Sequence, residues 1–243
     1  MTAHSPLAIS DGYATPGGSL WNPGRKPVQR YTIPAHLRWP FPDRPLNDDP
    51  VEPIDLTPEQ VQFYHDHGFI HGPHRLFSEK EMHSYIERLY DLEANIKAHN
   101  GGEWTNRYHV PGESVPDSFY ELVCELVLHP RVMHFVKQVL GSEDILVRNV
   151  DLVVKEPINR SSFHWHPDTY QDLGYFKEDI TTAWIGMTPS HNANGGLWFV
   201  DKSHMRSNHP DGVNEDCNAT ADEMGNPIEG VYEPGQMSCH HGR

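Results

Sequence analysis

The spacing of apolar residues changes near Gly141, from a repeat of about 3.6 residues before this glycine to a repeat of about 2 after it. The first repeat is typical of helices with one buried face, and the second is typical of half-buried strands. We therefore expect a helical first half and an all-β second half. Helices followed by regularly spaced strands favour a mainly β fold, a sandwich or jelly roll with helices packed outside it.

The segment LTPEQVQFYHDHGF carries the signals of a short helix. Thr57 can cap its start, and Pro58 suits the first helical position. Gln60 completes a capping box with Thr57, and Gly68 is a typical helix end. The ordered part of the chain is therefore expected to begin here.

The segment FSEKEMHSYIERLYDLEANIKAHNGG repeats these signals, with Ser78 and Glu81 as a second capping box. Apolar residues at helical spacing predict this helix and two more, which are separated at Pro130 and end at Gly141. The apolar positions are Met82, Tyr85, Ile86, Leu89 and Ile96, then Phe119, Leu122, Val123 and Leu126, then Val132, Phe135, Val136, Val139 and Leu140.

Five short segments after Gly141 are rich in β-branched and aromatic residues and are separated by Pro, Asn and Gly. We expect a strand in each of them. They are residues 144–157, 161–170, 180–190, 195–204 and 230–241. The acidic, polar stretch 207–230 is predicted to be a loop that lies beside the mouth of the jelly roll as a lid.

Residues 1–53 are rich in proline, in runs such as RWPFPDRP, and show no periodicity. We expect an irregular N-terminal arm here and a single domain over residues 54–243. The arm is either a disordered tail or a segment that wraps the domain and attaches to it through Trp39 and Phe41.

Charge and cysteine content narrow the class of protein. The formal net charge of −15 works against binding to a phosphate backbone, so nucleic acid is not an expected partner. Three widely spaced cysteines argue against a disulfide framework and against a Cys-rich zinc site. The N-terminus has no leader pattern, and no apolar run approaches ~18 residues. We expect a soluble, cytoplasmic protein without a membrane span, whose oligomeric state the sequence does not indicate.

The segment SSFHWHPDTY alternates polar and apolar residues, so in an extended chain His164, His166 and Asp168 share one face. Two histidines and one carboxylate on one face of an octahedral iron(II) leave the opposite coordination positions free. A hydrogen-bonded structural His–Asp pair is the alternative. The His-x-Asp pattern alone does not decide between them.

The chain carries, in this order, LTPEQVQFYHDHGFI, HPRVMHFVKQVLGSEDILVRN, FHWHPDTY, TTAWIGMTPSHNANGGLWFVDKSH and GQMSCHHGR. In order and spacing these segments resemble the phytanoyl-CoA dioxygenase family of iron(II)/2-oxoglutarate-dependent oxygenases, over residues 55–243. The most specific part is His-x-Asp followed by a Trp-Ile strand and an Asn-Gly-Gly-Leu turn. That turn leads to Lys-Ser-His, where the family usually has Gly-Ser-His.

The resemblance implies a double-stranded β-helix, a jelly roll whose open mouth holds iron(II) and the cosubstrate 2-oxoglutarate. His166 and Asp168 match the first two metal ligands of the family and are the candidate catalytic residues. His164 matches no family ligand, and we expect it to line the mouth. Four residues lie on strands that flank the 2-oxoglutarate pocket in such folds, although each also has an ordinary structural explanation: Asn149, Lys155, Thr182 and Trp184.

The family couples oxidative decarboxylation of 2-oxoglutarate by dioxygen to oxidation of a substrate C–H bond. The substrate is expected to be a small or lipid-like organic molecule, which the sequence does not identify. Relatives that halogenate lack the carboxylate that matches Asp168. Its presence therefore favours hydroxylation.

The resemblance also implies a distal metal-binding histidine a few residues beyond GQMSCHHGR, and an arginine further on that pairs with 2-oxoglutarate. Neither matches a residue up to Arg243. We expect either a fragment of a longer active protein, which turns over little 2-oxoglutarate as written, or a short form that is inactive or uses His241 as its third ligand. Because His240 and His241 are adjacent on a strand, at most one of them points into the mouth.

Two other functions stay open. A catalytically inactive jelly roll would use its mouth for binding or its helices for assembly. A zinc or manganese cupin would use the His-x-His pattern that His164, Trp165 and His166 spell. Metal content, combined with a 2-oxoglutarate-dependent succinate assay, separates these functions from the oxygenase.

Overall fold

The computed structural model describes residues 41–70, 72, 74–99, 107–109, 117–148, 150–155, 163, 165–168, 180–205, 225 and 227–242. Its helices are α1 (Pro58–His67), α2 (Glu79–His99), α3 (Asp117–Val127), α4 (Pro130–Leu140), and the short 3₁₀ turns η2 (Asn192–Asn194) and η3 (Ser203–Met205). Its strands are β1 (Phe69–Ile70), β2 (Arg107–His109), β3 (Asp151–Val153), β4 (Thr181–Ile185), β5 (Trp198–Val200), β6 (Pro227–Glu229) and β7 (Met237–His241). Within these ranges no helix is both long and apolar enough to cross a membrane.

Both predicted capping boxes are confirmed. At α1 the Thr57 hydroxyl accepts from the Gln60 backbone N–H at 3.3 Å, and the Gln60 side chain accepts from the Thr57 N–H at 2.8 Å. Gly68, with φ of 83°, ends this helix. Before α2 the Ser78 N–H donates to the Glu81 carboxylate at 2.7 Å, and the Glu81 N–H donates to the Ser78 hydroxyl at 3.1 Å.

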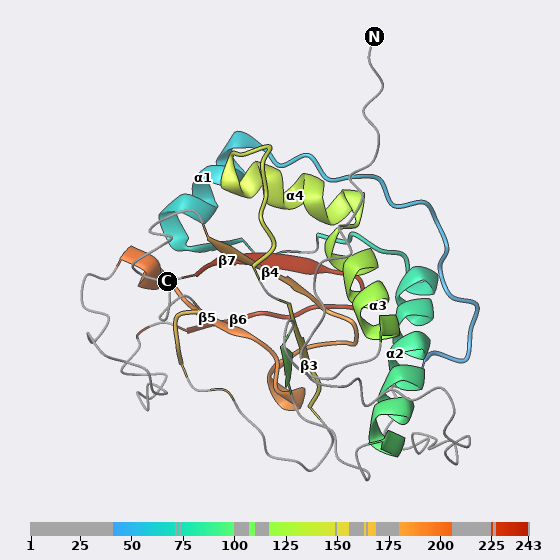
Figure 1. Ribbon diagram of the computed structural model, residues 1–243. Helices are drawn as coiled ribbons and strands as arrows, with labels where there is room; N and C mark the ends of the chain where they lie inside the picture. Colours follow the sequence, from blue (N-terminus) through green and yellow to red (C-terminus); the bar gives the residue numbers. More distant parts are fainter. Residues whose placement is uncertain are drawn as a thin grey trace, which may run out of the picture.

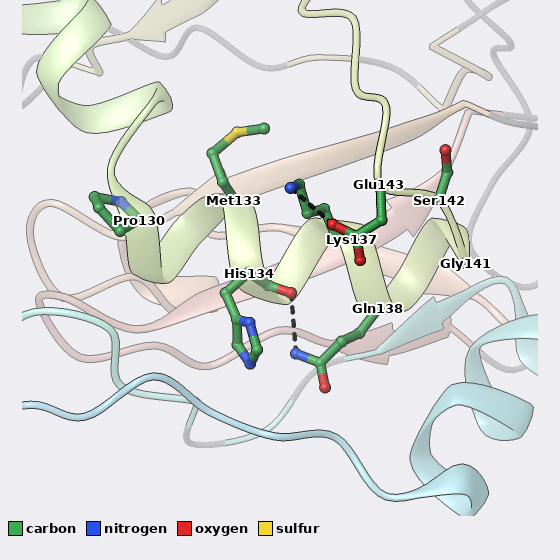
Figure 2. A pocket seen from close by; sticks show the side chains of 8 residues that line it. All are labelled: Pro130, Met133, His134, Lys137, Gln138, Gly141, Ser142 and Glu143. Carbon is green, nitrogen blue, oxygen red and sulfur yellow. Dashed lines mark hydrogen bonds and ion pairs between the residues drawn. The ribbon is translucent and has the colours of Figure 1, made fainter. Parts of the chain in front are cut away.

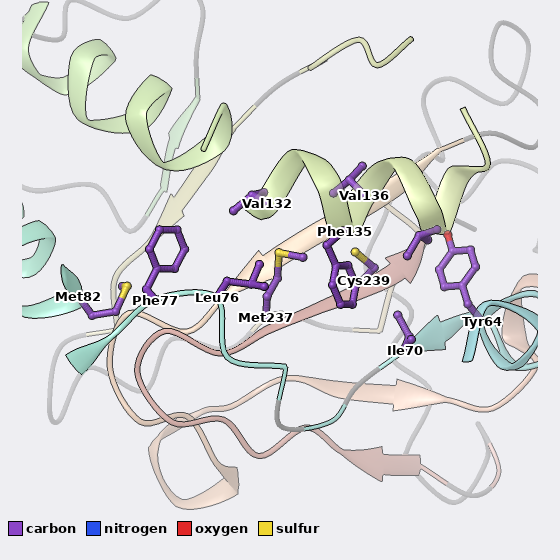
Figure 3. Close-up of a cluster of buried hydrophobic side chains, with 11 residues drawn as sticks. Tyr64, Ile70, Leu76, Phe77, Met82, Val132, Phe135, Val136, Met237 and Cys239 are labelled. Carbon is purple, nitrogen blue, oxygen red and sulfur yellow. The ribbon is translucent and has the colours of Figure 1, made fainter. Parts of the chain in front are cut away.

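The two faces of α4 have different surroundings. Its outer face borders a surface hollow of about 530 Å³ (Figure 2), where Lys137 pairs with Glu143 at 3.0 Å. Its inner face is apolar and packs on the largest sheet (Figure 3), with Phe135 fully buried at 0% exposure. This face anchors the helical layer to the strands.

The strands form three antiparallel sheets with the orders β1-β7-β4, β2-β3 and β5-β6. In Figure 1, α1 and α4 lie on one side of the first sheet, and the β5-β6 pair lies on the other. The described part of the chain therefore combines helices with small antiparallel sheets. Because these three sheets are separate, the described residues do not form a closed barrel.

The central strand β7 presents its side chains alternately to two different layers. Met237 and Cys239, both at 0% exposure, join the apolar core beneath α4. His240 faces the other way, toward β5, and the centroid of its ring lies 5.7 Å from that of Phe199. This alternation decides which residues of β7 reach the interior between the sheets.

The expected strand at 161–170 is wrong where the structure describes it. Trp165 makes an isolated bridge, and Asp168 lies in a turn. Pro167 accounts for the interruption, because proline has no N–H to donate to a continuous ladder. His166 and Asp168 still come together, but in irregular backbone.

Strands also occur where none was expected. The short strands β1 and β2 lie within the half of the chain predicted to be helical. β6 occupies the end of the predicted loop 207–230 and pairs with β5, with Ile228 opposite Phe199. Residues 207–224 lie outside the described residues, so the lid stays a prediction.

Residues 41–57 contain no helix or strand and lie against the helices. The ring of Phe41 meets the ring of His83 on α2 edge-on, with 4.1 Å between their centroids. Trp39 and the residues before it lie outside the described part. The wrapped arm thus remains a prediction for most of its length.

Candidate functional site

Three side chains from three parts of the chain meet at the carboxylate of Asp168. His166 lies two residues before Asp168, Thr182 lies on β4, and His240 lies on β7. The Thr182 hydroxyl donates to Oδ2 of Asp168, and Nε2 of His240 lies 2.9 Å from the same oxygen. Nε2 of His166 lies 3.3 Å from the other oxygen, Oδ1. We call these four residues the Asp168 cluster.

The strand register brings two members of the Asp168 cluster together. Thr182 and His240 are direct partners on the antiparallel strands β4 and β7. Paired residues project from the same face of a sheet, so both side chains reach Asp168 from one side. Thr181 and His241 are the next pair and face the opposite layer.

The electrostatics of the cluster favour an ionised carboxylate. Burial raises the pKa of Asp168, but hydrogen bonds from His166, His240 and Thr182 lower it by more. The net effect holds the pKa of this carboxyl well below its usual range. The cluster therefore presents a negative charge at neutral pH, which suits the binding of a cation.

The His166–Asp168 pair fits a metal ion. Neighbouring ligands around a first-row metal lie about 3 Å apart, because bonds of about 2.1 Å meet near 90°. The 3.3 Å between Nε2 of His166 and Oδ1 of Asp168 is close to that separation. Among the described residues no group of three His, Cys, Asp or Glu side chains is placed to hold a metal. The described residues thus supply two candidate metal ligands, His166 and Asp168, and His240 is hydrogen-bonded to Asp168.

His241, the predicted third ligand, lies away from Asp168. The centroid of its ring is 6.4 Å from that of Tyr64 on α1 and 5.1 Å from that of His204. Of the two adjacent histidines, His240 is the one beside Asp168. The geometry therefore does not favour His241 as a ligand, and that role stays a prediction.

The other predicted pocket residues have different outcomes. Thr182 belongs to the Asp168 cluster. Trp184 is two residues further along β4 on the same face and packs on Tyr232, with 4.8 Å between ring centroids. Asn149 and His164 lie outside the described residues. A role in holding 2-oxoglutarate stays a prediction for Asn149, Thr182 and Trp184, and a place in the mouth stays a prediction for His164.

Lys155 contacts the Asn-Gly-Gly-Leu turn. Its Nζ donates to the carbonyl oxygen of Gly195 at 2.5 Å and lies 5.7 Å from the centroid of the Phe163 ring. The Phe163 ring in turn lies 6.4 Å from that of His166. Burial lowers the pKa of Lys155 from its ordinary value. Through these contacts Lys155 links the Asn-Gly-Gly-Leu turn to Phe163 beside the site.

Sequence reasoning names His241 as the candidate ligand, whereas the structure places His240 beside Asp168. The alternation of a strand shows that the two histidines face opposite layers, but it does not tell which layer each one faces. That choice depends on the register between β7 and β4, which places His240 opposite Thr182. Thr182 was already a candidate, so this pairing is the signal that identifies His240.

The hollow on α4 is a poor alternative to the Asp168 cluster. His134, at its edge, pairs with Asp55 at 2.7 Å, and Gln138 donates to the Ile54 carbonyl at 2.9 Å. Its polar groups are thus engaged with residues 54 and 55 and with one another. The lining residues are Pro130, Met133, His134, Lys137, Gln138, Gly141, Ser142 and Glu143 (Figure 2).

The chain is similar to known proteins in both sequence and fold. Residues 64–243 match the family described as phytanoyl-CoA dioxygenase (PhyH). None of the curated protein sequences matches the chain.

Two solved structures show the same fold. The non-heme α-ketoglutarate-dependent carbocyclase SnoK from nogalamycin biosynthesis is 21% identical, with a TM-score of 0.56 over 79% of this chain and 78% of that chain. The epimerase SnoN, in complex with Fe³⁺, α-ketoglutarate and nogalamycin RO, is 19% identical, with a TM-score of 0.53 over 76% and 73% of the two chains. At these identities the likeness concerns the fold.

Proposed function

The chain belongs to the phytanoyl-CoA dioxygenase family, and from this premise we propose that it is an iron(II)- and 2-oxoglutarate-dependent oxygenase whose metal is held by His166 and Asp168. The observation that carries the proposal is the separation of 3.3 Å between Nε2 of His166 and Oδ1 of Asp168. An imidazole and an ionised carboxylate at this spacing suit two neighbouring positions on iron(II).

The residues of the Asp168 cluster have distinct tasks in this proposal. When bound, iron(II) with 2-oxoglutarate and dioxygen supplies the oxidising chemistry. Asp168 supplies the negative charge that attracts the dication, and His166 supplies a neutral nitrogen donor. Thr182 and His240 hold the carboxylate in place through its other oxygen.

We also propose that the complete domain is a double-stranded β-helix with the cluster in its mouth. The sheets β1-β7-β4 and β5-β6 pack face to face through Phe69, Phe199 and Tyr232. Two antiparallel sheets packed in this way are the framework of a jelly roll. His240 projects from the inner face of this sandwich.

The substrate in this proposal is a small or lipid-like organic molecule, and the expected outcome is hydroxylation of a C–H bond. Asp168 supports that outcome because it occupies a metal position that halide would otherwise take. SnoK and SnoN are a carbocyclase and an epimerase. Mass analysis of the product therefore has to decide between hydroxylation and another oxidation.

An anaerobic titration of metal-free protein with iron(II) tests the proposal. The wild-type chain should bind iron(II). His166→Ala and Asp168→Ala should each lower the affinity by at least about 10-fold. Their circular dichroism spectra should not change, because both residues lie in irregular backbone outside the apolar core.

His134→Ala is the matched control, because this histidine lies on the surface of α4 and pairs with Asp55, outside the Asp168 cluster. It should bind iron as the wild type does. A wild-type chain that binds no iron contradicts the proposal and favours the inactive jelly roll. Binding that survives in Asp168→Ala but is lost in His166→Ala, or turnover that needs metal but no 2-oxoglutarate, favours the cupin.

A further inference from the structure

We propose that His240 is a positioning residue, which together with Thr182 fixes the orientation of the Asp168 carboxylate and reserves one oxygen of it for the metal. This inference rests on the proposed function and assigns a role that the sequence motif does not contain. In this inference, three elements of the fold together fix the orientation of Asp168 as a metal ligand: the 166–168 segment, β4 and β7.

The hydrogen bonds are distributed unequally over the two carboxylate oxygens. The Thr182 hydroxyl and Nε2 of His240 both address Oδ2, the latter at 2.9 Å. Oδ1 has His166 as its neighbour, at 3.3 Å. Two donors on Oδ2 use lone pairs that a chelating carboxylate would need, so Asp168 is set up to bind a metal through Oδ1 alone.

The surroundings of His240 indicate which of its nitrogens carries the proton. Nδ1 is buried and has no hydrogen-bond partner among the described residues. Burying an N–H group without an acceptor costs free energy, and burying an imidazole lone pair without a donor costs less. The proton therefore lies on Nε2, which donates to Asp168. Nε2 of His240 then holds the carboxylate and, because it carries a proton, cannot bind the metal at the same time.

His240 is held firmly enough for this task. It lies on β7, the central strand of the β1-β7-β4 sheet, opposite Phe69 on one side and Thr182 on the other. Its side chain is only 17% exposed, and its ring packs near Phe199. A side chain fixed by a central strand can impose its geometry on Asp168, which lies in a turn.

Titration of the full chain with cobalt(II), followed by visible absorption under anaerobic conditions, tests the inference without relying on turnover. His240→Leu should weaken cobalt(II) binding by about 10- to 100-fold, as expected when the hydrogen-bond partner of a metal ligand is lost. His240→Gln should stay within a few-fold of the wild type, because its amide N–H can still donate to Oδ2.

Thr182 provides a second, smaller perturbation in case His240→Leu does not fold. Thr182→Val should weaken binding and Thr182→Ser should restore it. Thr181→Val is the matched control, because Thr181 faces the opposite layer and its hydroxyl bonds to the His240 carbonyl at 3.1 Å. The absorption spectrum should also change in His240→Leu and Thr182→Val, since the freed carboxylate can then bind through both oxygens.

The outcomes are distinguishable. A wild-type chain that binds neither cobalt(II) nor iron(II) overturns the proposed function, and the inference with it. Wild-type affinity in folded His240→Leu and Thr182→Val overturns the inference alone. If His240→Gln loses as much affinity as His166→Ala while Thr182→Val loses none, His240 is itself a ligand and the positioning role is wrong.

Discussion

Glu79 joins the arm to the start of α2 through its charge. Its carboxylate accepts from both terminal nitrogens of Arg44, at 2.9 and 2.7 Å, and from the Asn47 backbone N–H at 3.0 Å. The bonds from Arg44 and Asn47 lower the pKa of Glu79 to about 2. Because this value lies below that of an unfolded glutamate, the contact stabilises the protein fully above about pH 4.5 and is lost as the pH falls toward 2.

Glu79→Gln should therefore lower the free energy of unfolding at pH 7, and the loss should shrink as the pH falls from about 4.5 toward 2. The loss at pH 7 should stay below about 1 kcal/mol, because the Arg44 side chain is 53% exposed and the pair is screened by water. Urea unfolding at several pH values measures it. Glu143→Gln, at a 91% exposed glutamate, is the control and should change little. A loss that does not depend on pH would contradict the ionic account.

Single residues differ in how far the sequence could predict them. His166 and Asp168 lie in one local motif, so their meeting follows from the chain itself. Lys155, a candidate for the cosubstrate pocket, bonds to Gly195, which lies 40 residues away in the sequence. A Cβ on Gly195, whose φ is +84°, would lie 2.9 Å from Cδ of Lys155. Such long-range contacts leave no local signal.

At the scale of elements, the helices were predicted better than the strands. α1 and α2 begin at capping boxes, which are local and readable in the sequence. The strands are short, and their ends depend on partners far along the chain, such as the pairing of β1 with β7. The same dependence explains why β6 lies within a predicted loop and why the sequence does not tell which of His240 and His241 lies beside Asp168.

Phe135→Ala should be the costliest change on α4. Phe135 is fully buried in the core that joins this helix to Met237 and Cys239 of β7 (Figure 3). Deleting a buried phenylalanine side chain costs about 3–5 kcal/mol. Leu128→Ala removes a side chain that is 56% exposed and should cost less than about 0.5 kcal/mol.

Urea unfolding followed by circular dichroism compares the two variants. Because His240 projects from the opposite face of β7 to the one that packs on Phe135, folded Phe135→Ala protein should bind metal with an affinity near that of the wild type. Equal stabilities for Phe135→Ala and Leu128→Ala would mean that α4 does not pack on the sheet as described.

At the scale of the whole molecule, the family resemblance of the sequence is confirmed over residues 64–243. Chain order alone indicated helices before strands, and the described residues follow that order apart from β1 and β2. Closure of the sheets into a barrel was predicted from the resemblance and stays a prediction. The candidate metal site depends on contacts between distant parts of the sequence, because the 166–168 segment meets β4 and β7 through the bonds of Asp168 to Thr182 and His240.

Anomalous diffraction from crystals soaked with manganese(II) tests the central claim most directly, because it locates the ion. The account predicts an anomalous peak at about 2.0–2.2 Å from both Nε2 of His166 and Oδ1 of Asp168. Oδ2 should remain hydrogen-bonded to Thr182 and His240. A peak between His164 and His166 without Asp168, a peak on His241, or no peak at a saturating manganese(II) concentration would contradict it.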